Sequence, residues 1–390
     1  MTLLYSEVEE ELRAAVRAVL ADRCPPAAVL ARVESEPYDP GLWKTLAGEI
    51  GVAGLLVPEA HGGAGATASE AAVVLEELGR GVAPVPFFTS SVLATYALVR
   101  ATGTGAGETA AGETGAGVGL LRGLAEGRMT AALAVPFAAS PYRPWHGSPV
   151  SSGEPGGGGG EALLSGSVRS VAGADVADVL LVPVPGASAG GSATLYAVER
   201  DAAAVQAVPS LDLTRPVATV TLDGAPGTRL GVVDLAEVLR FGAGLLASEQ
   251  LGVAEWCLET TLAYVKERRQ FARPVGSFQA VKHRLADLWL DVVRARAAAR
   301  GAVSASGEGA PGGAGLDPVA VAVAQAWNGG VAVHAAEEAL QLHGGIGMTW
   351  EHPVHLFLKR AKAGEIALGT PGDHREALAS LAGVPGPGAE

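Results

Sequence analysis

The chain has 390 residues, of which 48% are hydrophobic and 18% charged, a composition typical of a globular protein that excludes an extended disordered one. Its formal net charge of −13 argues against a nucleic-acid-binding protein, because such a protein needs a basic face to neutralise phosphates. Two cysteines, Cys24 and Cys257, are too few for a disulfide framework and show no metal-ligand spacing, so we expect buried, reduced thiols and no metal.

The first third of the chain reads as helical, with apolar residues recurring every three or four positions. No basic stretch precedes an apolar core at the N-terminus, so we expect no signal peptide. We predict helices over Ser6–Ala21, with Val8, Leu12, Val16 and Val19 on one side, over Leu42–Ile50 and over Ser69–Leu78, a glycine-rich turn at Pro58–Gly65, and a flexible loop at Ala101–Gly119.

From about Met129 to Gly231 the period of the apolar residues changes to two, which predicts a compact β-barrel or sandwich. Glycine-rich segments at 152–160 and 186–192 are expected to be hairpin loops. The candidate strands are Thr130–Phe137, Glu161–Val171, Asp178–Pro185, Ala193–Glu199, Ala204–Pro209 and Val217–Leu222.

From Leu235 onward the pattern predicts long helices over Glu237–Arg268, Phe278–Arg300 and Pro318–His343, with a glycine-rich separator at 301–315. The uncharged runs 81–99 and 318–336 are broken by prolines or by polar residues and a glycine pair, so neither predicts a membrane span. We therefore expect an α+β protein of the cytoplasm with three domains: helical over 1–125, β over 126–231 and helical over 232–390.

Four segments resemble the acyl-CoA dehydrogenase family, and with the domain order they cover nearly the whole chain. They are PEAHGG followed by EELGR (58–63 and 76–80), RRQFARPVGSFQAVKH (268–283), QLHGGIGMTWE (341–351) and KRAKAGEIALGT (359–370). The resemblance implies an N-terminal helical domain, a small middle β-barrel, a C-terminal four-helix bundle and dependence on FAD.

Arginines at the predicted helix hairpin gather positive charge in an acidic protein, and guanidinium groups pair well with phosphate oxygens. A solvated basic face remains an equal reading of these residues alone. Glycines after His343 allow backbone amides to approach a ligand, although a simple helix C-cap explains them as well. By resemblance, the residues that hold the FAD pyrophosphate and adenosine across a subunit interface are Arg268, Gln270, Phe271, Gln279, Gln341, Gly344 and Gly345, with Thr370 as a further flavin contact near the same site.

The catalytic base of the family is absent from its usual places. The reaction needs a glutamate against one face of the acyl chain and the flavin against the other. The usual position holds Leu368, and the alternative one on the first long helix corresponds to Gly242. Glu249 and Glu365 are candidates for a displaced base, although solvated or salt-bridged glutamates are the more common outcome.

The middle domain also departs from the family pattern. Where the family has a Thr-Glu-Pro and a Trp-Ile-Thr stretch against the flavin ring, this chain reads 134–136 (AVP) and 170–172 (SVA). The ring-binding side chains are therefore missing unless Tyr142 or Trp145 replaces them.

Three functions remain open. The first is a subunit of a hetero-oligomeric acyl-CoA dehydrogenase, as in actinobacterial members that act on bulky CoA esters, paired with a related subunit and passing electrons to an acceptor protein. The second is a self-sufficient dehydrogenase with a relocated base. The third is a non-catalytic subunit that binds a CoA ester or a partner.

Overall fold

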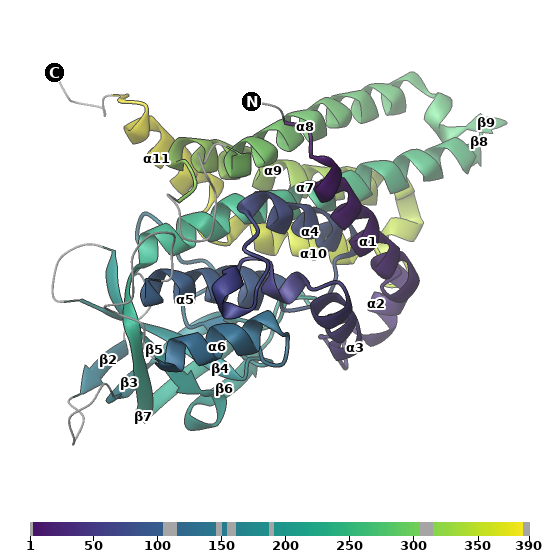
Figure 1. Cartoon of the computed structure of the whole chain (residues 1–390). Coiled ribbons are helices and arrows are strands. Elements are labelled where there is room, and N and C mark those ends of the chain that lie inside the picture. The colour runs from purple at the N-terminus through teal and green to yellow at the C-terminus, as the bar shows by residue number, and fades with distance from the viewer. Residues whose placement is uncertain are drawn as a thin grey trace.

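The computed structural model describes residues 3–103, 115–145, 150–153, 161–186, 191–304 and 315–384. The loops predicted at 101–119, 152–160, 186–192 and 301–315 lie wholly or partly outside the described residues. In Figure 1 the long C-terminal helices lie at the top, the sheet of the middle region lies at the lower left, and N-terminal helices lie between them. This arrangement confirms the α+β class.

The N-terminal region is helical from its first turns because polar side chains cap the helices. Ser6 and Glu9 form a capping box at the start of α1, and Thr67 and Glu70 form another at the start of α4. The helices and helical turns of this region are α1 (Glu7–Arg23), α2 (Pro26–Arg32), α3 (Pro40–Lys44), a π-helical turn (Thr45–Glu49), short 3₁₀ turns (Val52–Gly54 and Glu59–His61), α4 (Ala68–Gly81), a π-helix (Phe87–Ala94), α5 (Thr95–Thr102) and α6 (Gly115–Ala125).

Two expectations for this region were wrong in part. Val8 is 65% exposed, so the buried side of α1 begins at Leu12 rather than at Val8. The predicted loop at 101–119 overlaps the start of α6, whose glycines are tolerated because Leu121 and Leu124 anchor the helix in the core.

The middle region is a mixed sheet of seven strands among the described residues, in the order β1-β4-β5-β7-β3-β2, with β6 paired to β7. β1 and β4 are parallel and the other pairs antiparallel. The strands are β1 (Ala131–Leu133), β2 (Val150–Gly153), β3 (Glu161–Ala172), β4 (Val179–Pro185), β5 (Ser192–Glu199), β6 (Ala204–Val208) and β7 (Val217–Asp234). β7 is three times longer than predicted because it pairs in turn with β6, β3 and β5.

The C-terminal region contains long antiparallel helices, as predicted. They are α7 (Leu235–Glu267), α8 (Gln279–Ser304), α9 (Pro318–His343), α10 (Val354–Ile366) and α11 (Pro371–Leu381), with a hairpin of β8 (Arg269–Gln270) and β9 (Arg273–Pro274) between α7 and α8. Figure 1 shows this hairpin and α11 toward opposite ends of the helical region. Both cysteines are buried, as expected.

A close crossing of α4 and α7 joins the two helical regions. A Cβ on Gly79 would overlap the carbonyl oxygen of Glu249, and a Cβ on Gly252 would overlap that of Glu76. Both glycines are therefore required for the helices to approach this closely. The EELGR segment thus packs the N-terminal helices directly onto the longest C-terminal helix.

One described segment, Pro318–Met348, is long and apolar enough to cross a membrane by length and composition. However, 61% of its apolar window is buried inside the protein, where α9 packs against α7, α8, α10 and α11. A core helix of this kind passes the same test, so the segment is weak support for a membrane span.

Candidate functional site

A cavity of about 360 Å³ lies where α7 ends and α9 ends. Arg268 caps α7 and its backbone N–H donates to the carbonyl of Tyr264, while Gly344 ends α9 at a φ of +65°. The structure therefore brings together, at one cavity, residues that stand about 75 positions apart in the sequence. The cavity is lined by Tyr264, Arg268, Gln270, Val275, Leu342, His343, Gly344, Gly345 and Ile346.

The walls of this cavity offer hydrogen-bond donors with little steric obstruction. Positions where a Cβ would stand on Gly344 and Gly345 face open space, so their backbone can approach a ligand. Arg268 and Gln270 have exposed side chains. His343 is buried and its Nδ1 lies 2.7 Å from the Ala339 carbonyl, which gives it a structural role.

Phe271, Gln279 and Gln341 do not line this cavity. Phe271 is 88% exposed at the tip of the β8–β9 hairpin, with its ring centroid 6.2 Å from that of Phe278. Gln279 begins α8 and its Nε2 lies 3.5 Å from His283 Nε2. Gln341 is exposed one turn before the glycine pair. These positions are compatible with a ligand that extends beyond the cavity.

Within a single chain, Thr370 lies apart from this cavity, and its flavin contact stays a prediction. Pro371, the next residue, packs beside Gly329 in the middle of α9. Fifteen residues of helix separate Gly329 from Gly344, a distance of about 22 Å. The rigid helix α9 therefore keeps Thr370 apart from the cavity, and its hydroxyl caps α11 by accepting from the Asp373 backbone N–H.

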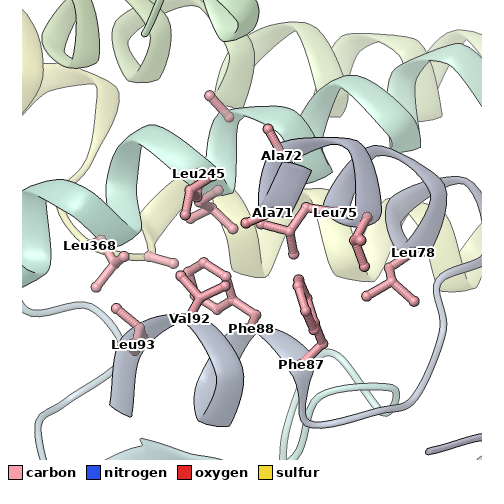
Figure 2. Packing of buried hydrophobic residues seen from close by; sticks show 14 of the residues in the cluster. Ala71, Ala72, Leu75, Leu78, Phe87, Phe88, Val92, Leu93, Leu245 and Leu368 are labelled. Carbon is pink, nitrogen blue, oxygen red and sulfur yellow. The ribbon is translucent and has the colours of Figure 1, made fainter. Parts of the chain in front are cut away.

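Leu368, at the usual position of the catalytic glutamate, is fully buried in an apolar environment. Figure 2 shows Leu368 and Leu93 pointing toward each other, with Leu245, Phe88 and Val92 beside them. A Cβ on Gly242 would lie 3.0 Å from Leu368 Cδ1 and closer still to Leu93. Both positions that carry the base in the family therefore lie in one region that is packed with apolar side chains. We call this region, formed around Leu93, Gly242 and Leu368, the chamber.

The turn that carries Leu368 is held in an unusual conformation. Leu368 has a φ of +53°, in the left-handed region that leucine seldom adopts. Its backbone N–H donates to the Phe137 carbonyl at 2.9 Å, and the imidazole Nε2 of His374 lies 3.1 Å from its carbonyl oxygen. The first contact joins the turn to the segment that follows β1, and the second joins it to α11.

The stretches 134–136 and 170–172 lie side by side, because the Phe137 N–H donates to the Ser170 carbonyl at 2.8 Å. Ala134, Val135, Val171 and Ala172 are all buried. None of these four residues has a side-chain hydroxyl, so none can donate a hydrogen bond from such a group to a flavin ring. Tyr142 does not replace them freely, because its hydroxyl lies 2.9 Å from Nδ1 of His374.

Glu249 occupies a buried ion-pair network that sequence reasoning missed. Arg215 donates to both of its carboxylate oxygens, and Arg360 also contacts it at 3.4 Å while bonding Asp212. Burial opposes the ionisation of Glu249, but the two guanidinium groups outweigh it and lower its pKa. A carboxylate bound in this way is a poor proton acceptor, so the structure argues against Glu249 as the displaced base.

The other candidate base, Glu365, lies on α10 with a side chain that is 30% exposed. Its carboxylate is 4.0 Å from Nζ of Lys362, which also pairs with Glu337 at 3.2 Å. Glu365 is thus a partly solvated ion-pair member, as the more common reading of such a glutamate predicts.

A second cavity, of about 440 Å³, lies between the start of α7 and α11. The sequence did not predict this cavity, because its side chains come from four separate segments that share no local motif. The residues lining it are Tyr142, Arg143, Arg240, Pro318, Asp373, Glu376, Ala377, Ser380 and Leu381.

Two segments of this chain match protein-family models. Residues 6–106 match the acyl-CoA dehydrogenase N-terminal domain, and residues 231–381 match the acyl-CoA dehydrogenase C-terminal domain. Acyl-CoA dehydrogenase IpdE2 of Mycolicibacterium smegmatis is 34% identical over 377 residues, which cover 96% of this chain and 98% of that protein. The chain belongs to the acyl-CoA dehydrogenase family.

Solved structures of the family agree. The ChsE4–ChsE5 complex from Mycobacterium tuberculosis is similar, with a TM-score of 0.82 and 30% identity over 99% of this chain and 100% of that one. A Tcur3481–Tcur3483 steroid acyl-CoA dehydrogenase has a TM-score of 0.81 and 29% identity over 98% and 99%. The resemblance inferred from residues 268–283 and 341–351 is therefore confirmed.

As an acyl-CoA dehydrogenase, the chain is unusual in one half of its site. The helix ends that resemble the family's nucleotide contacts converge on an open cavity. At the base positions, Leu93 and Leu368 fill the space beside Gly242. The residues that resemble the family's nucleotide contacts thus border an open cavity, whereas those at its two base positions are buried.

Proposed function

We propose that this chain is one subunit of a hetero-oligomeric, FAD-dependent acyl-CoA dehydrogenase, and that a related second subunit supplies the base and the ring-binding surface. The reaction removes hydrogens from the α and β carbons of a CoA thioester. The observation that carries the proposal is the contrast between the open cavity at Arg268 and Gly344 and the filled chamber at Leu368.

FAD is the cofactor of this family. The cavity residues fit its phosphate-bearing part, because Arg268 provides a guanidinium and the exposed glycine turn provides backbone amides. Gln270, Phe271, Gln279, Gln341 and Gly345 extend this surface in our proposal. Bound there, FAD would supply the acceptor for the hydride of the β carbon.

The residues around Leu368 do not fit the chemistry of proton abstraction. No carboxylate stands at either family position, and leucine cannot accept a proton. In our proposal this chain would hold the nucleotide end of a flavin, and the second subunit would provide the ring-binding surface. Thr370 would be a further flavin contact. The α-proton passes to a glutamate of the second subunit.

The domain boundaries, the cellular location, the electron acceptor and the substrate class also belong to this proposal. We place the domain boundaries at 1–125, 126–231 and 232–390, which accommodates both matched family domains. We propose that the enzyme works in the cytoplasm, passes its electrons to an electron-transfer acceptor and acts on a bulky thioester. Relatives that include a steroid acyl-CoA dehydrogenase support this substrate class.

The decisive experiment compares the chain alone with the chain co-expressed with the product of a neighbouring gene. We expect the lone chain to retain little FAD in its absorbance spectrum and to dehydrogenate no CoA ester, and the complex to recover both, with fewer flavins than subunits. Stoichiometric flavin and turnover in the lone chain would contradict the proposal. Loss of that turnover in Glu365→Gln would then identify a relocated base.

A further inference from the structure

Three histidines gather around the loop that joins α9 to α10. The loop begins with the 3₁₀ turn Gly344–Met348, whose glycines line the cavity of about 360 Å³. A Cβ on Gly347 would lie 3.1 Å from the Cβ of His343, so the turn packs directly against this last residue of α9. The ring of His343 contacts those of Tyr264 and His352, with centroids 4.5 Å and 4.4 Å away. The two ends of the loop are thus joined by a pair of imidazole rings.

His352 holds the far end of this loop through a hydrogen bond that its protonation would abolish. Its Nδ1 accepts the backbone N–H of Val354, the first residue of α10, at 3.3 Å. Val354 has no exposed surface, so water cannot replace this bond. Protonation of Nδ1 would break the bond, leave a buried donor unsatisfied and place a positive charge at the N-terminal end of a helix dipole.

The titratable neighbours of His352 oppose its protonation as well. From α9, His343 Nδ1 donates to the Ala339 carbonyl, and from α10, His355 Nε2 donates to the Trp350 carbonyl, because a carbonyl oxygen can only accept. Burial first, and then the charges that His343 and His355 would carry, lower the pKa of His352. The neutral form of His352 is therefore favoured by its bond, its burial and its neighbours.

Neither neighbouring histidine is well placed to take a proton instead. The Nδ1 of His355 is buried and has no hydrogen-bond partner among the described residues. Burial and the charge of Lys359 lower the pKa of His355, against the opposing effects of the Trp350 carbonyl and of Glu34. Burial also lowers the pKa of His343, against its own backbone bond. The three rings are thus stable together only while they are uncharged.

We propose that neutral His352 is a positioning residue for the turn Gly344–Met348, and that the loop from this turn to α10 opens when His352 takes up a proton. In an open loop the imidazole regains its ordinary pKa of about 6.5, so protons favour opening as the pH falls below that value. Opening stays local, because α9 and α10 both pack against α7.

The consequence for the cofactor rests on the proposed function. The backbone amides of the glycine turn bind the nucleotide only while the turn holds them in place. A complex that contains this chain should therefore retain FAD less tightly in mild acid than at neutral pH.

The test is hydrogen–deuterium exchange of the full chain, followed by mass spectrometry at pH 7.5 and pH 5.5 without flavin or partner. After correction for the effect of pH on intrinsic exchange, peptides spanning 344–354 should lose protection several-fold at pH 5.5. The loss should be at most about tenfold, which is the limit at this pH for one group with an ordinary pKa of about 6.5.

His352→Asn separates position from charge, because an asparagine side chain accepts a backbone N–H two residues on and does not titrate. Its protection should match the unmodified chain at pH 7.5 and stay within about twofold at pH 5.5. His352→Leu has no acceptor and should show low protection at both pH values. His334→Asn, an exposed position on α9, is the matched control and should keep the pH dependence of the unmodified chain.

Protection that does not change with pH in the unmodified chain, or an equal acid loss in His352→Asn, would overturn the inference. Thermal unfolding checks that the variants fold, and the His352→Asn comparison decides the question even where His352→Leu does not fold. In the assembled complex, flavin fluorescence should report faster FAD release at pH 5.5 than at pH 7.5, except in His352→Asn. Equal release rates would overturn the link between the loop and the nucleotide. Because the exchange measurement needs neither flavin nor partner, it can fail while the proposed function stands, and the reverse also holds.

Discussion

Gly242 shows how one missing side chain shapes the chamber at the family's base position. Leu93 and Leu368 occupy the space that any Cβ at this position would enter. The chamber is therefore packed to the point where no glutamate could be placed at position 242 without displacing Leu93 and Leu368.

We predict that Gly242→Ala destabilises the chain by about 1–3 kcal/mol, because an extra methyl in a packed core forces neighbours to shift. Chemical unfolding should reveal this loss, and Leu93→Ala in the same chain should recover part of it. Gly330→Ala is the control: nothing lies within 4 Å of its Cβ position, so this helical glycine should gain stability instead. An equal loss in both variants would mean that the chamber has room.

Glu249 contributes to the stability of the fold through two guanidinium partners, and we do not expect it to take part in catalysis. We predict that Glu249→Gln lowers the free energy of unfolding by about 3–5 kcal/mol, because Arg215 and Arg360 would lose a buried counter-charge. Glu365→Gln, at a partly exposed position, should change stability by less than about 1 kcal/mol. A Glu249→Gln chain of unchanged stability would show that the network is not structural.

At the scale of elements, this network joins three segments that share no local sequence signal. Asp212 and Arg215 precede β7, Glu249 lies in α7 and Arg360 in α10. Arg215 also lies 5.2 Å from the ring centre of Phe88 and 5.5 Å from that of Phe137. The network thus joins the segment before β7 to α7 and α10.

The network predicts a pH dependence of stability. Because the folded-state pKa of Glu249 is lowered from 4.5, its contribution is present above pH 4.5 and is lost as the pH falls through the lower folded value. Urea unfolding from pH 7 to pH 3 should therefore show a decrease in stability below about pH 4.5. The decrease should be smaller in Glu249→Gln, and equal slopes would assign the acid sensitivity to other groups.

The β8–β9 hairpin is strained at its tip. Phe271 and Ala272 have φ values of +52° and +62°, where two-residue turns prefer glycine or asparagine. We predict that Ala272→Gly raises the free energy of unfolding by about 0.5–1 kcal/mol, since relief of the left-handed conformation exceeds the entropy that glycine adds to the unfolded chain.

The control for the hairpin is Ala18→Gly, at an exposed position inside α1, which should lose about 0.5–1 kcal/mol. Differential scanning calorimetry of both variants should show changes of opposite sign in the free energy of unfolding. A loss in both would indicate that the tip is not strained in solution.

At the scale of the whole molecule, an acidic protein presents a local arginine-bearing surface at the end of its longest helices. Arg268 is exposed and its side chain makes no ion pair among the described residues. Its role is therefore separable from folding.

We predict that Arg268→Gln leaves the unfolding of the lone chain unchanged within about 0.5 kcal/mol but reduces the FAD content of the assembled complex several-fold, because a phosphate partner is lost. Absorbance of the purified complex reports the flavin. Arg122→Gln, an exposed arginine on α6, should retain full flavin. Equal flavin content in both complexes would remove Arg268 from the proposed site.

The sequence by itself determined the local structure and the family. The predicted span of α9 agrees with the observed Pro318–His343 to the residue, because Asp317 caps its start, Pro318 occupies the first turn and Gly344 ends it. The strands β3 to β6 were predicted within two residues, since each alternates between a buried and an exposed face or is bounded by turn residues.

Only the tertiary structure decided which of these residues meet. Gly242, Leu93 and Leu368 meet in one packed region, and Glu249 is bound by two arginines, although none of these groups forms a sequence motif. The physical reason is that capping, periodicity and turn chemistry act over a few residues, whereas burial and pairing depend on segments that folding brings together from distant parts of the chain.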